Sequence, residues 1–402
     1  MQDTSAHPRP VPRAAPSPLQ VVVLMTVTAL LISSEQYVII PLLAPLGQRF
    51  GVTPTVAAWA GSAFSFAFAA GNLFFGPLSD RRGRLQVIVP GLWALTGLTL
   101  LVSLSPSFAV LAALRALQGF VAASFASAAL TYLVETLPPQ RRASGIAAVS
   151  SSFLIAGVLG QVYASAVSSA LGWAAVFGLL VPAYVVLALL LRRLPLTLPP
   201  ASGQSWAEVL ARMGRLMRSW PLLLTLLVGL TLLLSFVAMY IGLSAHLAQA
   251  YGLSARELLW VRLAGLPGLL LSPFTGALIN RWGARAVITA GLVTAILGLL
   301  GEALLPSLAG VVIGSAVFVA GIGVTVPGVL ARVSVLGSEA RGAANAVYGA
   351  AVFLGASLGP VLAGVLAPHG FTALTLTLAA ILAAAALLAQ LRPEARTALR
   401  VS

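Results

Sequence analysis

Long apolar segments alternate with short polar connections along almost the whole chain. Twelve segments are rich in leucine, valine, alanine and phenylalanine, and each ends at a few polar or charged positions or at glycine and proline. Because a helix of roughly 20 apolar residues spans the hydrocarbon core of a bilayer, each segment is predicted to be a membrane-spanning helix. The predicted helices lie at residues 19–47, 56–78, 85–105, 108–137, 143–171, 173–191, 221–250, 258–279, 286–305, 308–336, 342–367 and 371–391.

The connection between the second and third predicted helices recurs in the second half of the chain. It runs from Gly71 to Arg84 and ends in a charged turn of about five residues, Asp80 to Arg84, which must lie at a membrane surface because charge is costly inside a bilayer. Gly76, Arg81 and Gly83 of this connection have counterparts 200 positions later, which are Gly276, Arg281 and Gly283; Asn280 replaces the acid. The two halves are therefore predicted to be copies in parallel orientation.

Polar stretches divide the chain into five regions. Residues 1–18 are rich in proline and polar residues and are predicted to be a disordered cytoplasmic tail. Residues 19–191 form the first six-helix unit and residues 220–391 the second, joined by the linker 192–219. Residues 206–218 of this linker are a candidate amphipathic helix at the membrane surface. Residues 392–402 are a second cytoplasmic tail.

Composition and charge exclude an ordinary soluble protein. Hydrophobic residues make up 59% of the 402 positions and charged residues only 8%, whereas soluble domains carry about 25% charged residues. The net charge of +14 comes from 23 basic residues, all arginine. All but four arginines fall on the side of the two termini, which predicts that both termini are cytoplasmic and makes nucleic-acid binding the poorer explanation. The absence of cysteine excludes disulfides and thiolate metal sites.

The motif Gly71-x-Leu-x-x-Gly76-x-Leu-x-Asp80-Arg81-x-Gly83-Arg84 resembles the connection between helices 2 and 3 of the major facilitator superfamily. The resemblance implies an all-α membrane protein with twelve transmembrane helices in two pseudo-symmetric six-helix bundles around a central cavity. It also implies a secondary transporter of the cell inner membrane that works as a monomer, binds a small-molecule substrate, needs no cofactor and uses the proton gradient.

The same resemblance assigns the charged residues around this connection to a conformational latch. Asp80 is expected to face the N-terminus of helix 11 near Arg341, where the positive helix end favours an anion. Arg84 is expected to pair with Glu135 at the end of helix 4. Plain orientation charges are the alternative explanation. The residues of this latch are Gly76, Asp80, Arg81, Gly83, Arg84, Glu135 and Arg341.

Glu35 and Arg115 are the clear pair of opposite charges within predicted helices. Arg115 lies in Arg115-x-x-Gln118-Gly, similar to the helix-4 motif that the superfamily links to proton coupling. A fixed cation favours proton release from a nearby carboxyl, and an apolar cavity favours the proton-bound form, so Glu35 is a candidate proton carrier. An acidic residue of helix 1 has this role in similar drug–proton antiporters and also attracts cationic substrates. The simpler alternatives are an arginine that caps carbonyl groups and a glutamate that reaches water.

Further polar and aromatic residues lie on helices that line the cavity in relatives. Aromatic residues in membrane proteins serve mainly in packing, a single histidine is more often structural, and Arg262 lies near enough to the outer surface to reach water. Glu302, at the outer end of helix 9, is expected to be solvated. The candidates for the substrate cavity are Ser34, Gln36, Tyr37, Gln118, Phe236, Tyr240, His246, Arg262, Asn345 and Tyr348.

Three functions remain open from the sequence. The first is a proton-coupled exporter of drugs or small organic solutes. The second is an uptake symporter or facilitator for a small organic anion bound by Arg115 and Arg262; Gln161 favours it, since antiporters of the family have proline at this position of helix 5. The third is a transporter-like receptor or a membrane enzyme, for which the sequence offers no catalytic set, phosphate-binding loop or metal cluster.

Overall fold

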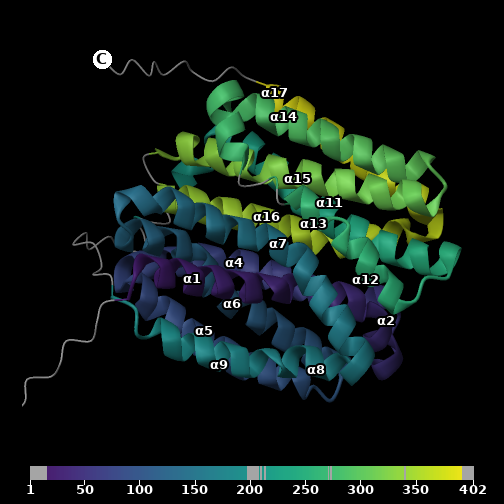
Figure 1. The fold of residues 1–402 in the computed structure, drawn as a ribbon, viewed down its shortest axis with the longest axis horizontal. Helices are drawn as coiled ribbons and strands as arrows, with labels where there is room; N and C mark the ends of the chain where they lie inside the picture. Colours follow the sequence, from purple (N-terminus) through teal and green to yellow (C-terminus); the bar gives the residue numbers. More distant parts are fainter. Residues whose placement is uncertain are drawn as a thin grey trace, which may run out of the picture.

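The computed structural model describes residues 16–196, 208, 211, 214–269, 271, 274–338 and 341–391. Over these ranges the chain forms helices and turns and no strand, and the helices run side by side along the long axis of the molecule (Figure 1). Most of the two tails and more than half of the linker lie outside the described residues; within the candidate surface helix at 206–218, residues 208, 211 and 214–216 are helical.

Six spans make up the N-terminal half. Three of them are single helices broken only by one residue, since Val38, Ala58 and Leu179 keep right-handed helical torsion angles between the paired helices. The helices are α1 (Pro18–Tyr37), α2 (Ile39–Phe50), α3 (Pro54–Ala57), α4 (Trp59–Arg82), α5 (Arg84–Ser103), α6 (Phe108–Thr136), α7 (Pro139–Leu171), α8 (Trp173–Gly178) and α9 (Leu180–Leu191).

The C-terminal half repeats this plan with one interrupted span. The predicted eighth helix is divided into α12, α13 and the first turns of α14, and Gly283 separates those turns from the ninth span with a positive φ of 81°. The helices are α11 (Trp220–Tyr251), α12 (Ala255–Leu263), α13 (Leu266–Leu269), α14 (Thr275–Leu304), α15 (Leu308–Leu336), α16 (Arg341–Leu366), the short 3₁₀ helix η3 (Ala367–His369) and α17 (Gly370–Gln390).

The number of apolar helices agrees with a membrane protein of this plan. Within the described ranges, nine stretches are long and apolar enough to cross a membrane, or up to ten if the bent helix α7 counts as one span. One of the nine, Ala343–Gln390, contains both α16 and α17, and the interrupted pieces α12 and α13 are not among them. The prediction of twelve spans is consistent with this finding.

Matching helices and glycines confirm the internal repeat. Helix α6 covers 108–136 and α15 covers 308–336, an offset of 200 residues. Gly83 and Gly283 both have positive φ angles, as do Gly51 and Gly252. Helix α4 continues to Arg82 and α5 begins at Arg84, so the charged turn predicted at 80–84 is wrong in length: Gly83 alone makes the connection. Its φ of 94° is one that residues with a side chain rarely adopt.

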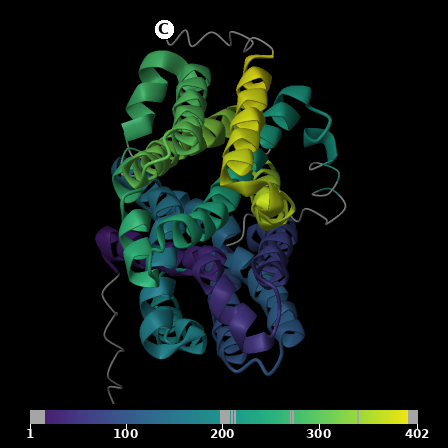
Figure 2. The same ribbon diagram turned by 90° about the vertical axis from the view of Figure 1, so that its right-hand side faces the viewer.

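The two halves meet along two lines of contact. Helix α4 packs along α16, where the rings of Phe68 and Phe353 stack 3.8 Å apart and the Ser62 hydroxyl donates to the carbonyl of Ser357 at 2.8 Å. Helix α7 packs against α12 and α13. Figure 2 shows the N-terminal half, in purple and blue, below the green and yellow C-terminal half. We call the side where α1 begins and α17 ends the terminal side and the other the distal side (Figure 1).

Candidate functional site

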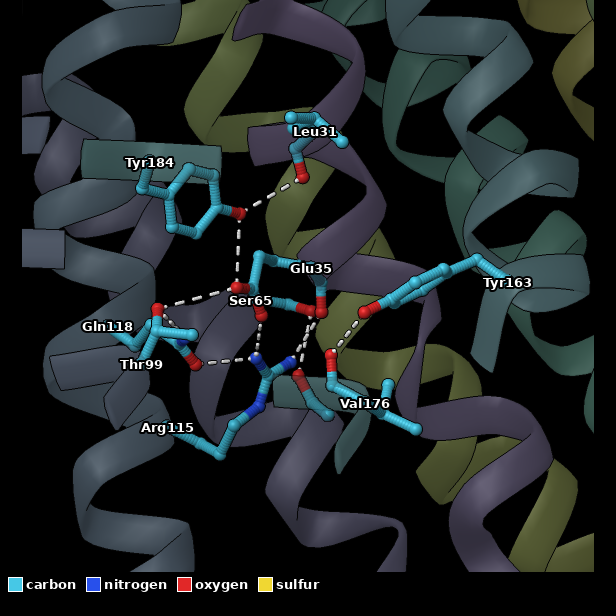
Figure 3. Close-up of polar contacts among 10 residues, drawn as sticks. Leu31, Glu35, Ser65, Thr99, Arg115, Gln118, Tyr163, Val176 and Tyr184 are labelled. Carbon is cyan, nitrogen blue, oxygen red and sulfur yellow. Dashed lines mark hydrogen bonds and ion pairs between the residues drawn. The ribbon is translucent and has the colours of Figure 1, made fainter. Parts of the chain in front are cut away.

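A buried polar cluster lies inside the N-terminal half. Helix α1 supplies Glu35, α5 supplies Thr99, α6 supplies Arg115 and Gln118, and α9 supplies Tyr184 (Figure 3). Glu35 and Arg115 have no solvent-exposed surface. Because an isolated charge is costly in such surroundings, the two groups must satisfy each other and their neighbours.

The guanidinium of Arg115 binds helix α1 at two atoms. One nitrogen, Nη1, donates to Oε2 of Glu35 at 3.1 Å and to Oε1 of Gln118 at 2.7 Å. The other, Nη2, donates to the backbone carbonyl of Glu35 at 2.6 Å. The guanidinium also lies over the ring of Phe64, 4.2 Å from its centre, and 5.6 Å from that of Phe177. These contacts fix the arginine between α1, α4, α6 and α8.

The carboxylate of Glu35 is surrounded by donors. Besides Arg115, the hydroxyl of Tyr184 lies 3.1 Å from Oε1 and that of Thr99 lies 3.5 Å from it. Tyr184 is also 3.2 Å from the carbonyl of Leu31, so its single proton serves one acceptor at a time. The amide of Gln118 donates to the Thr99 hydroxyl at 2.8 Å. A cation and two hydroxyl groups around one carboxylate favour its ionised form in this conformation.

This geometry settles the orientation of the two charged groups. Glu35 does not reach water and Arg115 does more than cap carbonyl groups, so both simpler alternatives are wrong. The partners of the Glu35 side chain all come from α5, α6 and α9 of the N-terminal half, so the carboxylate points into that bundle.

The residues predicted to line the substrate cavity do not lie together: some meet between the two halves, some bond within the N-terminal half, and the others lie in the C-terminal half away from both groups. Tyr37 and Phe236 meet across the two halves with ring centres 5.7 Å apart, and Tyr240 lies 5.0 Å beyond Phe236. Ser34 donates to the carbonyl of Leu30 and Gln36 to the hydroxyl of Ser65. His246 stacks on Phe371, Tyr348 is buried against Gly229, and Asn345 is exposed. The structure therefore brings Tyr37, Phe236 and Tyr240 together and leaves His246 and Asn345 apart.

Arg262 and Glu302 are both buried, which excludes the water-facing alternative for Arg262 and contradicts the prediction for Glu302. Arg262 is 3% exposed and does not reach water; it donates to Ser165 of α7 at 2.5 Å and to Ser244 of α11 at 3.0 Å. It therefore joins the two halves on the distal side. Glu302 is 3% exposed, so the expectation that it is solvated is wrong. The prediction rested on the place of Glu302 near the end of a membrane-spanning helix, where water is close, but neighbouring helices cover the side chain.

The connection after α4 contains the Arg84–Glu135 ion pair that the resemblance implies and, in addition, an ion pair between Arg84 and Asp80 that was not predicted. Arg84 is buried and contacts Glu135 at 3.1 Å, the Ser79 hydroxyl at 2.9 Å and the carboxylate of Asp80. Gly76 packs against α16, since a Cβ there would lie 3.3 Å from that of Ala346. Arg81 is exposed, and the Arg341 side chain lies outside the described residues. The latch role of these residues stays a prediction.

Several residues of the site were missed from the sequence. Thr99, Tyr184, Phe64 and Phe177 surround the ion pair, and Ser165 and Ser244 hold Arg262. A polar atom inside a strongly apolar helix was the signal available for Thr99 and Tyr184. Where the structure describes the chain, no group of three histidine, aspartate or glutamate residues is arranged to hold a metal ion.

Two repeated halves of long apolar helices with buried charged residues define a multi-pass membrane protein. A family model described as the Major Facilitator Superfamily matches residues 25–337 and 240–400, so the chain belongs to that family. It is 27% identical over 272 residues to the uncharacterized MFS-type transporter YybF of Bacillus subtilis, covering 66% of each chain. It is 26% identical over 274 residues to an uncharacterized transporter of Buchnera aphidicola, covering 66% of this chain and 65% of that one. The chain thus spans about two thirds of these relatives' lengths.

Solved structures share the fold. The crystal structure of the human organic anion transporter MFSD10 (TETRAN) matches with a TM-score of 0.72 at 22% identity, covering 94% of this chain and all of that one. A bacterial homologue of the human lysosomal transporter Spinster, in an inward-facing and unoccupied conformation, matches with a TM-score of 0.70 at 16% identity, covering 92% and 96%. The chain is therefore a multi-pass membrane protein with the major facilitator fold.

Proposed function

We propose that this chain is a proton-coupled secondary transporter that exports small organic solutes across the cell inner membrane, with both termini in the cytoplasm. The two halves alternate between openings to either side, and the proton gradient supplies the energy. The observation that carries the proposal is the fully buried ion pair between Glu35 and Arg115.

Protonation of Glu35 is the proposed switch. A proton on the carboxylate removes the negative charge that Arg115 binds, and an uncompensated buried cation is strongly unfavourable. The bundle must then repack, or the cation must find another partner. Loss of the proton restores the pair. Two packings of α1 that differ in one proton are the two-state element that coupling needs.

Helix α1 can transmit this change to the other half. Arg115 holds the backbone carbonyl of Glu35 as well as its carboxylate, so the guanidinium fixes the end of α1 itself. Two residues further on, the ring of Tyr37 meets Phe236 of α11. A shift of α1 therefore alters a contact between the halves within one helical turn.

The test is proton movement in proteoliposomes that contain a pH-sensitive dye. Cationic, neutral and anionic solutes are added in turn to wild type, to Glu35→Gln and to the matched control Glu257→Gln. Glu257 is exposed and caps α12, where glutamine also serves. We expect a substrate-evoked pH change in wild type and the control that is lost in Glu35→Gln. Substrate flux with no pH change, or one unaffected by Glu35→Gln, would overturn the proposal.

A facilitator for a small organic anion is the second candidate, favoured by Arg262. Among the residues with described side chains, Arg262 has two serine partners and no carboxylate partner, and it bridges the halves. A guanidinium in this position suits a carboxylate or sulfonate substrate. This candidate predicts that anions are transported by Glu35→Gln and not by Arg262→Gln. The exporter hypothesis predicts the opposite result, that transport is lost in Glu35→Gln and kept in Arg262→Gln.

A further inference from the structure

The C-terminal half contains a buried carboxyl group that the proposed mechanism does not use. Glu302 lies two residues before the end of α14 and is 3% exposed. Within the described part of the chain, neither of its carboxyl oxygens has a hydrogen-bond partner. Glu35, by contrast, has an arginine and two hydroxyl groups around it. The two buried glutamates therefore occupy opposite electrostatic environments.

Close helix packing covers Glu302. A Cβ added to Gly314 of α15 would lie 3.0 Å from Cγ of Glu302 and 2.8 Å from its backbone nitrogen. The glycine thus lets α15 pass directly over the glutamate. The position is also unfavourable for an anion, because the C-terminal end of a helix carries partial negative charge.

The ionisable groups around Glu302 do not neutralise it. The Tyr240 hydroxyl of α11 is buried and has no hydrogen-bond partner among the described residues, so it donates no hydrogen bond to Glu302. Arg262 of α12 donates instead to Ser165 and Ser244. Helix α17 has no ionisable residue, and the single arginine of α15, Arg332, lies near its opposite end.

We propose that Glu302 is a proton-binding site of the C-terminal half, occupied in this conformation and separate from the Glu35–Arg115 pair. An ionised carboxylate buried without donors is so costly that such groups take up a proton instead. The bond concerned is one carboxyl O–H, whose proton passes to water when the distal side opens. Two groups can then stabilise the carboxylate by donating hydrogen bonds to it. One is the Tyr240 hydroxyl, which has no partner among the described residues, and the other is Arg262, once its hydrogen bond to Ser165 has broken.

The site is tested by infrared spectroscopy of the full-length protein in lipid, which separates the C=O stretch of a protonated carboxyl from the bands of a carboxylate. Difference spectra compare wild type with Glu302→Gln, Glu35→Gln and the exposed control Glu257→Gln near neutral pH. We expect a protonated-carboxyl band in wild type, lost in Glu302→Gln and kept in the other two variants. Absence of that band in wild type, or its survival in Glu302→Gln, would overturn the proposal.

Two measurements keep the proposal testable if Glu302→Gln does not fold. In wild type alone, the band must vanish on alkaline titration and shift in deuterated water, as a bound proton requires. Sodium chloride is then compared with choline chloride at equal ionic strength. A band insensitive to sodium supports a proton site, whereas its loss in sodium would show a site for that cation and would refute the proton. The infrared band of Glu302 does not depend on whether Glu35→Gln abolishes proton coupling, so either proposal can be refuted without refuting the other.

Discussion

The ion pair between Glu35 and Arg115 makes a quantitative prediction about stability. The shortest distance between the charged groups is 3.1 Å, and neither residue is exposed. At an effective dielectric constant of about 20, two unit charges at that distance attract by about 5 kcal/mol. Most of this attraction offsets the cost of burying the two charges, so the pair as a whole contributes little net stability.

The perturbation is a double-mutant cycle of Glu35→Gln, Arg115→Met and the double variant. Each single change leaves one buried group without its partner and is expected to cost about 3–5 kcal/mol. The double variant removes both charges together, so we expect it to lose less than the sum of the single variants by about 3 kcal/mol or more. The reason is that the cost comes from the uncompensated charge and not from the missing attraction.

Thermal unfolding of the purified protein provides the assay, followed by the fluorescence of its 7 tryptophans. The single variants should melt several degrees below wild type, and the double variant should recover much of the loss. Strict additivity of the two single effects would show that the groups do not interact, and the proposed switch would lose its physical basis. A Glu35→Gln variant as stable as wild type would also refute the proposed switch, because it would show that a buried Arg115 without its carboxylate partner costs no stability.

Three further predictions concern other parts of the chain. Gly83→Ala forces a side chain into a φ of 94° and should lower stability by about 1–2 kcal/mol. Gly97→Ala, at an exposed position of α5 with open space around it, should be neutral or slightly stabilising; the melting temperatures of the two variants decide. Tyr184→Phe removes the 3.1 Å hydrogen bond to the buried carboxylate and should cost about 1–3 kcal/mol by the same assay. Hydrogen bonds from Ser254 at the α12 cap hold the pKa of Glu257 below its usual range. The stability advantage of wild type over Glu257→Ala should therefore be full above a pH of about 4.3 and disappear as the pH falls further. An advantage that persists in acid would refute this prediction.

Sequence patterns predicted an all-helical membrane protein and its internal repeat, because the length of an apolar run and the glycines at turns follow directly from bilayer thickness and backbone geometry. They also predicted that Glu35 and Arg115 belong together, since two opposite charges in apolar helices are rarely left apart. The one-residue connection at Gly83 was not predicted, because charged residues such as Arg81 extend a helix as readily as they form a turn.

The orientation of side chains around a uniformly apolar helix could not be predicted. Helix α9 is apolar on every face, so its sequence does not indicate that Tyr184 points toward α1. Glu302 illustrates the same difficulty. Its place in the chain defines its depth in the membrane, but whether it meets water depends on the path of α15 across it, which no local pattern contains.

Comparison of the repeated halves indicates how their chemistry has diverged. Helices α6 and α15 are equivalent at an offset of 200 residues, and at that offset Ser315 occupies the position of Arg115. The N-terminal bundle therefore has a buried cation for its glutamate, whereas the described part of the C-terminal bundle has a buried hydroxyl there and a glutamate without a partner. A carboxyl with a fixed cation changes its packing when it gains a proton, and a carboxyl without one changes when it loses a proton. Under the two proposals made above, these opposite responses would let a single proton gradient favour each conformation in turn.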